Sequence, residues 1–278
     1  MAIISAFADE IDDDPTIQMD TMESVNVRHI ELRGAWGVNV MKFSAEQRSE
    51  LKKMFTDRGF GVACIGSPIG KVKMDDDYDK HFDDFKHAVD LADEFDCRYV
   101  RIFSYYPPDG DDIANHRDEI IRRLKQKAEF LADRSVTLVL ENEGDIYGET
   151  PERCLDLLEA LDDEPKITGA FDPANFVYAN CLPVYDRCWK PLRKYSGYIH
   201  VKDKQANVDG PCCPAGEGDG AFPAILKDLA AAGYDGFMAL EPHLAAGGQF
   251  GGKTGPDRFP IAARALQTLC DQAGLAYQ

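Results

Sequence analysis

The chain alternates short apolar runs with longer segments that have the spacing of helices. The short runs are rich in β-branched and aromatic residues, which is typical of strands. Eight of them occur, at residues 3–7, 29–33, 61–67, 98–104, 137–142, 166–172, 197–203 and 236–242. Of the stretches between them, residues 44–59 offer Ser44 as an N-cap and Gly59 as a stop, and residues 79–95 carry apolar residues three and four apart. We expect such stretches to be crossover helices.

Strands that return about every 30 to 40 residues with a helix in each gap predict parallel pairing, and eight such units predict a closed (β/α)₈ TIM barrel. A doubly wound open sheet is the alternative, but its first strand would lead into a Gly-rich phosphate loop, and "SAFADEIDDDP" is not one. No linker-like tract interrupts the alternation, so we predict one domain over residues 1–278. The long loops 204–222 and 243–259 would follow the seventh and eighth strands, on the face where barrels place their active sites.

Composition and charge narrow the classes of partner. The 278 residues are 44% hydrophobic, enough for a large core, and 31 basic against 49 acidic residues give a formal net charge of −18. Such a charge repels phosphate backbones and anionic membranes, so neither nucleic acid nor a membrane is an expected partner. The first residues turn acidic without a basic leader, and no apolar run is long enough to span a bilayer, so we expect a cytoplasmic protein with eight reduced cysteines.

Charged side chains stand at the ends of the last four predicted strands. The fifth strand ends at Glu141, the sixth at Asp172 and the eighth at Glu241, and the seventh carries His200 near its end. Because the C-terminal ends of barrel strands converge on one mouth, we expect these four side chains to meet. Three carboxylates alone would repel one another, and carboxylate and imidazole ligands suit Mn²⁺, Mg²⁺, Co²⁺ or Zn²⁺. The pattern therefore predicts a site for one divalent metal ion.

The same segments resemble a known family. "IELR" in the second strand, "LENE" in the fifth, "FDPANF" in the sixth, "YIHVKD" followed by "PAGEGDGAF" in and after the seventh, and "LEPH" in the eighth are similar to the xylose isomerase-like barrels. Within them the chain looks most like the sugar phosphate isomerase/epimerase group, which also holds ketose 3-epimerases, inosose-processing enzymes and endonuclease IV. The resemblance covers nearly the whole chain, and the motifs follow one another in the order and at the spacing of the family.

The resemblance implies specific roles. It implies that Glu141, Asp172, His200 and Glu241 bind one divalent metal ion, and that Glu141 and Glu241 lie on opposite faces of a bound ketose, where each can move a proton. A metal that bridges a carbonyl and a neighbouring hydroxyl oxygen stabilises an enediolate, which makes such proton transfer feasible. The family's endonucleases need further histidines, one of them at the position of Asn175, so DNA repair is not expected. Many ketose 3-epimerases also have histidine there, which weakens that assignment.

Further residues near the predicted mouth are candidates for binding substrate. They are Lys71 and Lys202, which could pair with a phosphate or carboxylate; Asn175, which could hydrogen-bond a hydroxyl; Glu143, which has the parity of Glu141; and Trp36, which could cover a sugar ring. Glu143 as an extra base would suit dehydration of an inosose or cleavage of a 3-keto glycoside, so a lyase is the alternative to an isomerase or epimerase. A metal-bound barrel without catalytic activity is a third. The exact carbohydrate, its phosphorylation, the native metal and a homo-oligomeric state stay open.

Overall fold

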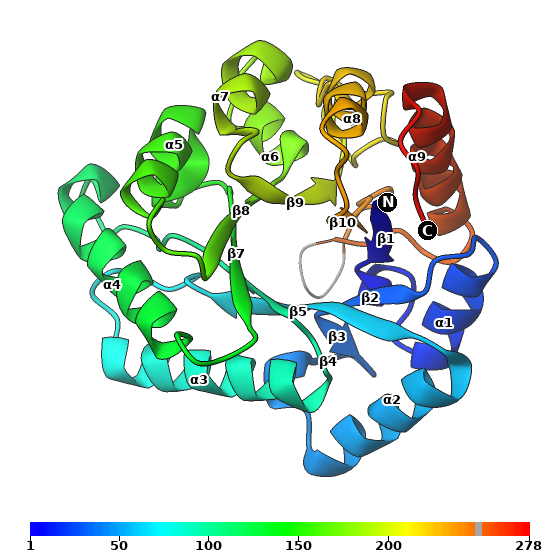
Figure 1. Cartoon of the computed structure of the whole chain (residues 1–278), viewed down its shortest axis with the longest axis horizontal. Coiled ribbons are helices and arrows are strands. Elements are labelled where there is room, and N and C mark those ends of the chain that lie inside the picture. Colours follow the sequence, from blue (N-terminus) through cyan, green and yellow to red (C-terminus); the bar gives the residue numbers. More distant parts are fainter. Residues whose placement is uncertain (248–251) are drawn as a thin grey trace.

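The computed structural model describes residues 1–247 and 252–278, and its centre is a barrel of parallel strands (Figure 1). The barrel strands are β1 (Ile3–Ala6), β2 (His29–Leu32), β5 (Gly61–Ile69), β6 (Tyr99–Ile102), β7 (Thr137–Glu141), β8 (Ile167–Phe171), β9 (Ser196–Val201) and β10 (Phe237–Leu240). They pair in the closed order β1-β10-β9-β8-β7-β6-β5-β2. A two-stranded hairpin of β3 (Gly34–Ala35) and β4 (Val38–Asn39) follows β2. The predicted TIM barrel is confirmed, with each of the eight expected strands in place.

Helices cover the outside of the barrel (Figure 1). The α-helices are α1 (Pro15–Glu23), α2 (Ala45–Arg58), α3 (Tyr78–Glu94), α4 (Arg117–Phe130), α5 (Pro151–Ala160), α6 (Pro173–Tyr178), α7 (Lys190–Leu192), α8 (Phe222–Ala231) and α9 (Phe259–Ala273). Short 3₁₀ turns lie at Ala8–Glu10, Val40–Lys42, Ile113–His116 and Tyr147–Glu149, and a π-helical turn at Tyr185–Trp189.

The predicted limits of α2 have a clear local cause. The hydroxyl of Ser44 accepts from the amide of Gln47, and the Gln47 side chain accepts in return from the amide of Ser44, which is a complete capping box. At the other end Gly59 adopts φ 69°, a left-handed conformation that glycine reaches without steric cost. The two signals in the sequence are therefore confirmed as the start and stop of this helix.

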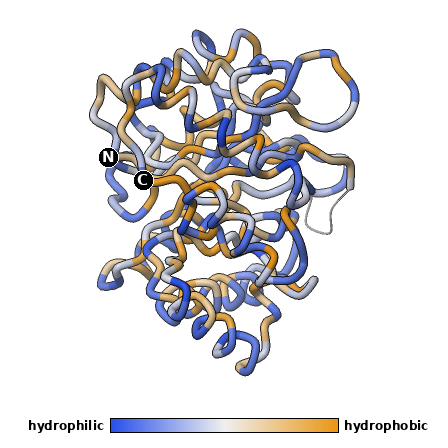
Figure 2. Tube along the Cα trace, turned by 90° about the vertical axis from the view of Figure 1, so that its right-hand side faces the viewer, coloured by the Kyte–Doolittle hydropathy of each residue, from blue (hydrophilic) through white to orange (hydrophobic). Residues whose placement is uncertain are grey.

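Two packed regions hold the barrel together. The larger fills the space between the strands and the helices, and the smaller lies inside the barrel, where it includes Phe7, Val139, Ala170, Tyr198 and Ala239. Figure 2 shows the hydrophobic stretches running through the middle of the molecule and hydrophilic stretches in its outer loops. Burial of these apolar surfaces on both faces of the strands is what stabilises a parallel sheet.

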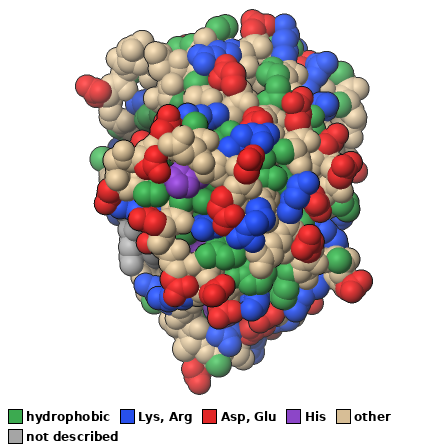
Figure 3. All heavy atoms as spheres, turned by 90° about the vertical axis from the view of Figure 1, so that its left-hand side faces the viewer, with side chains coloured by type: hydrophobic (Ala, Val, Ile, Leu, Met, Phe, Trp, Pro, Cys, Tyr) green, Lys and Arg blue, Asp and Glu red, His purple; other side chains and the backbone are tan. Residues whose placement is uncertain are grey.

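The outer surface is mixed in charge. Acidic and basic side chains are interspersed across the face drawn in Figure 3, and many are ion-paired, such as Arg117 with Asp156 at 2.7 Å and Arg187 with Glu152 at 3.2 Å. In the part of the chain that the structure describes, no helix is long and apolar enough to cross a membrane.

Candidate metal centre

The alternation of side chains along the strands places four polar groups in one layer of the barrel. Successive strand residues point to opposite faces, so a residue two positions after an inward one also points inward. Val139, Ala170, Tyr198 and Ala239 belong to the apolar cluster inside the barrel. Two residues further on, towards the C-terminal mouth, stand Glu141, Asp172, His200 and Glu241. The apolar layer is thus followed by a polar layer. Strands β7 and β9 each supply one member, and the residues directly after β8 and β10 supply the other two.

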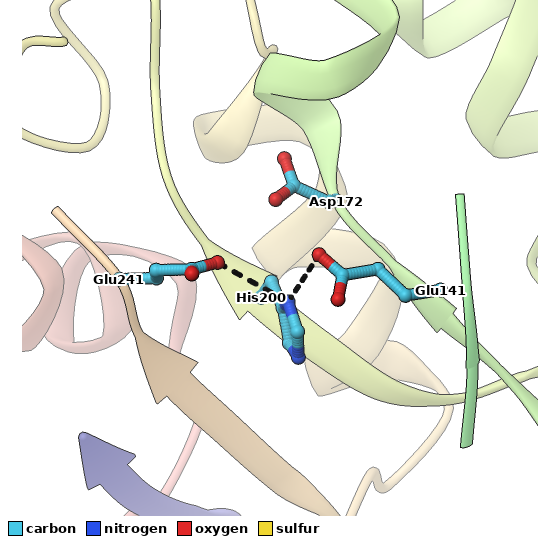
Figure 4. Close-up of side chains that lie close together, drawn as sticks. All are labelled: Glu141, Asp172, His200 and Glu241. Atoms are coloured by element: carbon cyan, nitrogen blue, oxygen red, sulfur yellow. Dashed lines mark hydrogen bonds and ion pairs between the residues drawn. The ribbon is translucent and has the colours of Figure 1, made fainter. Parts of the chain in front are cut away.

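The four side chains of this polar layer meet, as Figure 4 shows. Each offers a ligand atom, and these atoms all lie within 4.8 Å of one another. Nδ1 of His200 is 3.0 Å from Oε1 of Glu141 and 3.6 Å from Oε2 of Glu241, so the imidazole lies between the two glutamates. All four residues are buried, and Asp172 is fully so. The sequence-based expectation that these strand ends converge agrees with this geometry; metal binding itself stays a prediction.

Three buried cations surround the acidic groups. Nη1 of Arg33 is 2.8 Å from Oε1 of Glu241, and Nη1 of Arg101 is 3.2 Å from Oε2 of Glu141. Nζ of Lys202 is 2.6 Å from Oδ2 of Asp172. Each carboxylate of the layer therefore has its own cationic partner, which reduces the cost of burying three negative charges together.

The titration of these groups follows from their contacts. Burial alone would lower the pKa of His200, but the charge of Glu141 and its hydrogen bond raise that pKa to about 10. Burial would raise the pKa of Glu141, yet the charges of His200 and Arg101 lower it to about 2. Burial, with Glu141 and Glu241, raises the pKa of Asp172 to about 6 against the opposing effect of Lys202. Without a bound cation these shifts favour carboxylates around a protonated imidazole, and a metal ion bound by His200 would displace that proton.

The donor set fits a divalent cation. Oδ2 of Asp172 and Oε2 of Glu241 are buried and accept no hydrogen bond. Oδ2 of Asp172 is ion-paired with Lys202, but the contact does not have the geometry of a hydrogen bond. Buried acceptors in this state are costly unless a cation completes their environment. Carboxylate oxygens with one imidazole form a ligand set that suits Mn²⁺, Mg²⁺, Co²⁺ or Zn²⁺. Glu141, Asp172, His200 and Glu241 would hold such an ion.

Asn142 supports this layer and was missed as a site residue in the sequence. Its side-chain Nδ2 donates to the backbone oxygen of Asp172 at 2.9 Å, and its Oδ1 accepts from the backbone amide of Asp172 at 2.8 Å. Asn175 completes the link, because its Nδ2 donates to the backbone oxygen of Asn142 at 2.8 Å. The sequence hints at a role for Asn142 because it directly follows Glu141 in "LENE". The contacts of its side-chain amide become visible only when β7 and β8 are paired.

A second acidic group adjoins the layer and was also missed. Glu10, Glu241 and His243 offer ligand atoms that lie within 4.8 Å of one another, and Glu241 belongs to both groups. Nε2 of His243 is 3.1 Å from Oε1 of Glu10 and 3.5 Å from Oε1 of Glu241. His243 stands two residues after Glu241 in "LEPH". Residues with this spacing point to the same face of a strand, so the sequence could have indicated that His243 lies near Glu241. The approach of Glu10, from the 3₁₀ turn after β1, could not be read from spacing.

The predicted substrate-binding residues occupy distinct places. Lys202 is buried beside Asp172, and the amide of Asn175 is used by Asn142. Nζ of Lys71 is 2.7 Å from Oε2 of Glu143, and both side chains are part-exposed, at 32% and 26%. Trp36 lies in the β3–β4 hairpin with its ring edge-on to Phe43, at 6.1 Å between ring centroids. Their contact with a substrate stays a prediction.

Comparison with known proteins adds a family description. A family model described as a xylose isomerase-like TIM barrel matches residues 20–270. A search of curated proteins finds no significant match.

Several solved structures have the same fold. A xylose isomerase-like TIM barrel protein from Mycobacterium smegmatis in complex with magnesium is 18% identical, with a TM-score of 0.76 over 99% of this chain and 98% of that one. A probable 3-DHS dehydratase from Bacillus anthracis is 17% identical, with a TM-score of 0.74 over 96% and 99%. The 3-keto-D-glucoside 4-epimerase of E. coli is 13% identical, with a TM-score of 0.65 over 97% and 99%. At these identities the likeness shows the fold.

Proposed function

The chain belongs to the xylose isomerase-like TIM barrels, and from that premise we propose that it is a divalent-metal-dependent isomerase or epimerase of a sugar, sugar phosphate or related keto-polyol. The observation that carries the proposal is the buried layer of Glu141, Asp172, His200 and Glu241, whose ligand atoms lie within 4.8 Å of one another at the mouth of the barrel. Barrels place their chemistry on this face.

The arrangement of the two glutamates supports proton transfer. A divalent ion held by the four side chains would polarise a substrate carbonyl and so acidify the neighbouring C–H bond. Glu141 and Glu241 lie on opposite sides of His200 (Figure 4), because β7 and β10 approach the mouth from different sides of the barrel. Burial would raise the pKa of Glu241, but Lys202 and His200 lower it well below its usual value, so its carboxylate is ionised.

The role we assign to each glutamate is that of a general base or its conjugate acid. One carboxylate removes a proton from the carbon beside the carbonyl, and the other, which must enter the step protonated, delivers its proton from the opposite side. Delivery to the same carbon on its other face gives an epimer. Delivery to the former carbonyl carbon, with the hydroxyl proton moving to the former carbonyl oxygen, gives an isomer. Arg33 and Arg101, at 2.8 Å from Glu241 and 3.2 Å from Glu141, hold the two carboxylates in position.

A lyase is the second candidate function. Glu143 follows Glu141 by two residues, and its carboxylate is a quarter exposed and 2.7 Å from the ammonium group of Lys71. An additional acid–base group of this kind would suit the loss of water or of an aglycone from a 3-keto sugar. A structural neighbour is itself a probable 3-DHS dehydratase. The proton-transfer machinery of the two candidate functions is the same, and their products differ.

Incubation with ketoses and 3-keto sugars in D₂O tests the proposal. The purified protein is supplied with Mn²⁺ or Co²⁺, and the products are followed by NMR and mass spectrometry. Incorporation of one carbon-bound deuterium with no other change of formula supports an isomerase or epimerase, and loss of water or aglycone supports the lyase. A complete lack of exchange across the panel would contradict both and leave a barrel without catalytic activity.

A further inference from the structure

The cations around the acidic layer are already paired, and from this we infer that the substrate is an uncharged polyhydroxy ketone rather than a sugar phosphate or sugar acid. This inference rests on the proposed function and specifies its substrate. It concerns five side chains that contact the carboxylates described above: Arg33, Lys71, Arg101, Lys202 and His243.

Arg33 and Arg101 are buried and each contacts a protein carboxylate. Nε of Arg33 is 2.8 Å from Oδ2 of Asp9, in addition to its contact with Glu241, and its side chain is 4% exposed. The guanidinium carbons of Arg33 and Arg101 lie 4.7 and 4.9 Å from the ring centroid of Phe7. A guanidinium that binds a phosphate must turn its edge to it. The edge of Arg33 faces Asp9 and Glu241, and Arg101 donates to Glu141 and to the backbone oxygen of Gly66.

Lys202 and His243 are also paired with protein carboxylates. The ammonium group of Lys202 is 2.6 Å from Asp172 and 3.7 Å from Oε2 of Glu241, in a side chain that is 5% exposed. The imidazole of His243 lies between Glu10 and Glu241. An anionic ligand at either group would compete with buried carboxylates for the same cation.

The glycine-rich loop after β9 does not offer its amides to a phosphate. TIM barrels frequently bind phosphate in the loops that follow their last two strands. In this chain the amides of Gly216, Gly218 and Gly220 all donate to the carboxylate of Asp203, at 2.8, 3.0 and 2.9 Å. The negative charge that an anion would supply is therefore already provided by the protein.

Lys71 is the most exposed of the five side chains, and it is tied to Glu143. Its ammonium group also lies 4.3 Å from the ring centroid of Phe103. The pair presents a hydrogen-bond donor and an acceptor side by side, and a hydroxyl group can satisfy both because it donates and accepts. A phosphate dianion has acceptors but no donor, so it would meet the repulsion of Glu143. The pair is thus suited to the hydroxyls of a neutral polyol.

Matched ligands and one charge-changing variant test this inference. Binding of D-fructose and D-fructose 6-phosphate, and of D-tagatose and its 6-phosphate, is measured by calorimetry on Mg²⁺-loaded protein. Binding of inorganic phosphate to metal-free protein is measured by ³¹P NMR. We expect the neutral member of each pair to bind at least about 10-fold more tightly than its phosphate ester, and inorganic phosphate not to bind. Equal or tighter binding of the phosphorylated member, or of inorganic phosphate at the mouth, would overturn the inference.

Glu143→Gln releases Lys71 from its carboxylate and keeps the size of the side chain. We expect this variant to gain about 10-fold or more in affinity for inorganic phosphate. Glu152→Gln on helix α5 is the matched control, because it releases the surface residue Arg187 of the π-helical turn; this variant is expected to gain less. A Glu143→Gln variant that gains no more than this control would contradict the inference even where neither ketose binds. Absence of proton exchange in D₂O would count against the proposed function alone, because these measurements record binding.

Discussion

The side-chain amide of Asn142 hydrogen-bonds both polar backbone atoms of Asp172, at 2.9 and 2.8 Å. This two-point contact links the end of β7 to the end of β8 and fixes the position from which Asp172 extends its carboxylate. Partners that orient a ligand in this way commonly contribute 10- to 100-fold to metal affinity. Asn142 is therefore a positioning residue of the candidate metal centre.

We predict that Asn142→Ala weakens Mn²⁺ binding by about 10- to 100-fold, because Asp172 loses the contact that orients it. Calorimetric titration with Mn²⁺ measures the change. Asn115→Ala is the control, since Asn115 is exposed and its amide donates only to surface residue Asp111. Equal Mn²⁺ affinity in the two variants would show that Asn142 does not position the centre.

Glu141 and Glu241 are the proposed proton-transfer groups. The effect of replacing either one is measured by C–H exchange and not by metal binding. We predict that Glu141→Gln and Glu241→Gln each reduce C–H exchange in D₂O by about 100-fold or more, a loss of roughly 3 kcal/mol of transition-state stabilisation. Glu159→Gln, on the exposed side of α5, should keep the wild-type rate. If both site variants exchanged protons at the wild-type rate, the two-base account would be wrong.

Lys127 gives a prediction about stability and pH. This lysine of α4 is 1% exposed, donates to the hydroxyl of Tyr105 and lies 5.2 Å from the ring centroid of Tyr78. Burial, with the charges of Arg123 and Arg122, lowers its pKa from 10.5 to about 7. Between these values the unfolded chain holds a proton that the folded chain has lost, so this group makes the protein more stable as pH rises from about 7 towards 10.5.

We therefore predict that Lys127→Met removes a rise in unfolding free energy of at most about 1.4 kcal/mol per pH unit in that range. Urea unfolding of wild type and variant at several pH values gives the difference. Lys125→Met, on the same helix but partly exposed, should leave the slope of the wild type unchanged. Parallel pH profiles for wild type and Lys127→Met would show that Lys127 is not held neutral.

The loop after β9 depends on a close approach at Gly218. A Cβ atom there would lie 2.3 Å from Oδ1 of Asp203 and 2.7 Å from the backbone carbon of Lys204. We predict that Gly218→Ala destabilises the protein by about 1–3 kcal/mol, because the loop must move away from the carboxylate that binds its amides. Thermal unfolding measures the effect. Gly144→Ala, whose Cβ would meet nothing within 4 Å, should unfold close to the wild-type temperature.

The sequence predicted the barrel because eight strand segments recur along the chain with helical segments between them. It predicted the convergence of Glu141, Asp172, His200 and Glu241 because strand ends in a closed barrel meet at one mouth. These results follow from periodicity and topology alone.

Contacts that depend on loop conformation could not be predicted. Glu10 reaches Glu241 and His243 from the turn after β1, and no spacing rule places such a turn. The role of Asn142 depends on the register of β7 against β8, which pairs Glu141 with Ala170 and so brings Asn142 level with Phe171, next to the backbone of Asp172 that its side chain contacts. From the sequence alone one would expect Lys127 to be an exposed helix residue. Its burial depends on the aromatic rings that pack beside it in the fold. The sequence thus shows which strands carry the candidate metal ligands, and the structure shows which side chains contact them.

Anomalous scattering from crystals soaked in Mn²⁺ tests the central claim most directly. The account predicts one manganese peak within bonding distance of Glu141, Asp172, His200 and Glu241, at the C-terminal mouth of the barrel. A map without a peak among these four residues, or with their side chains turned away from one another, would contradict it.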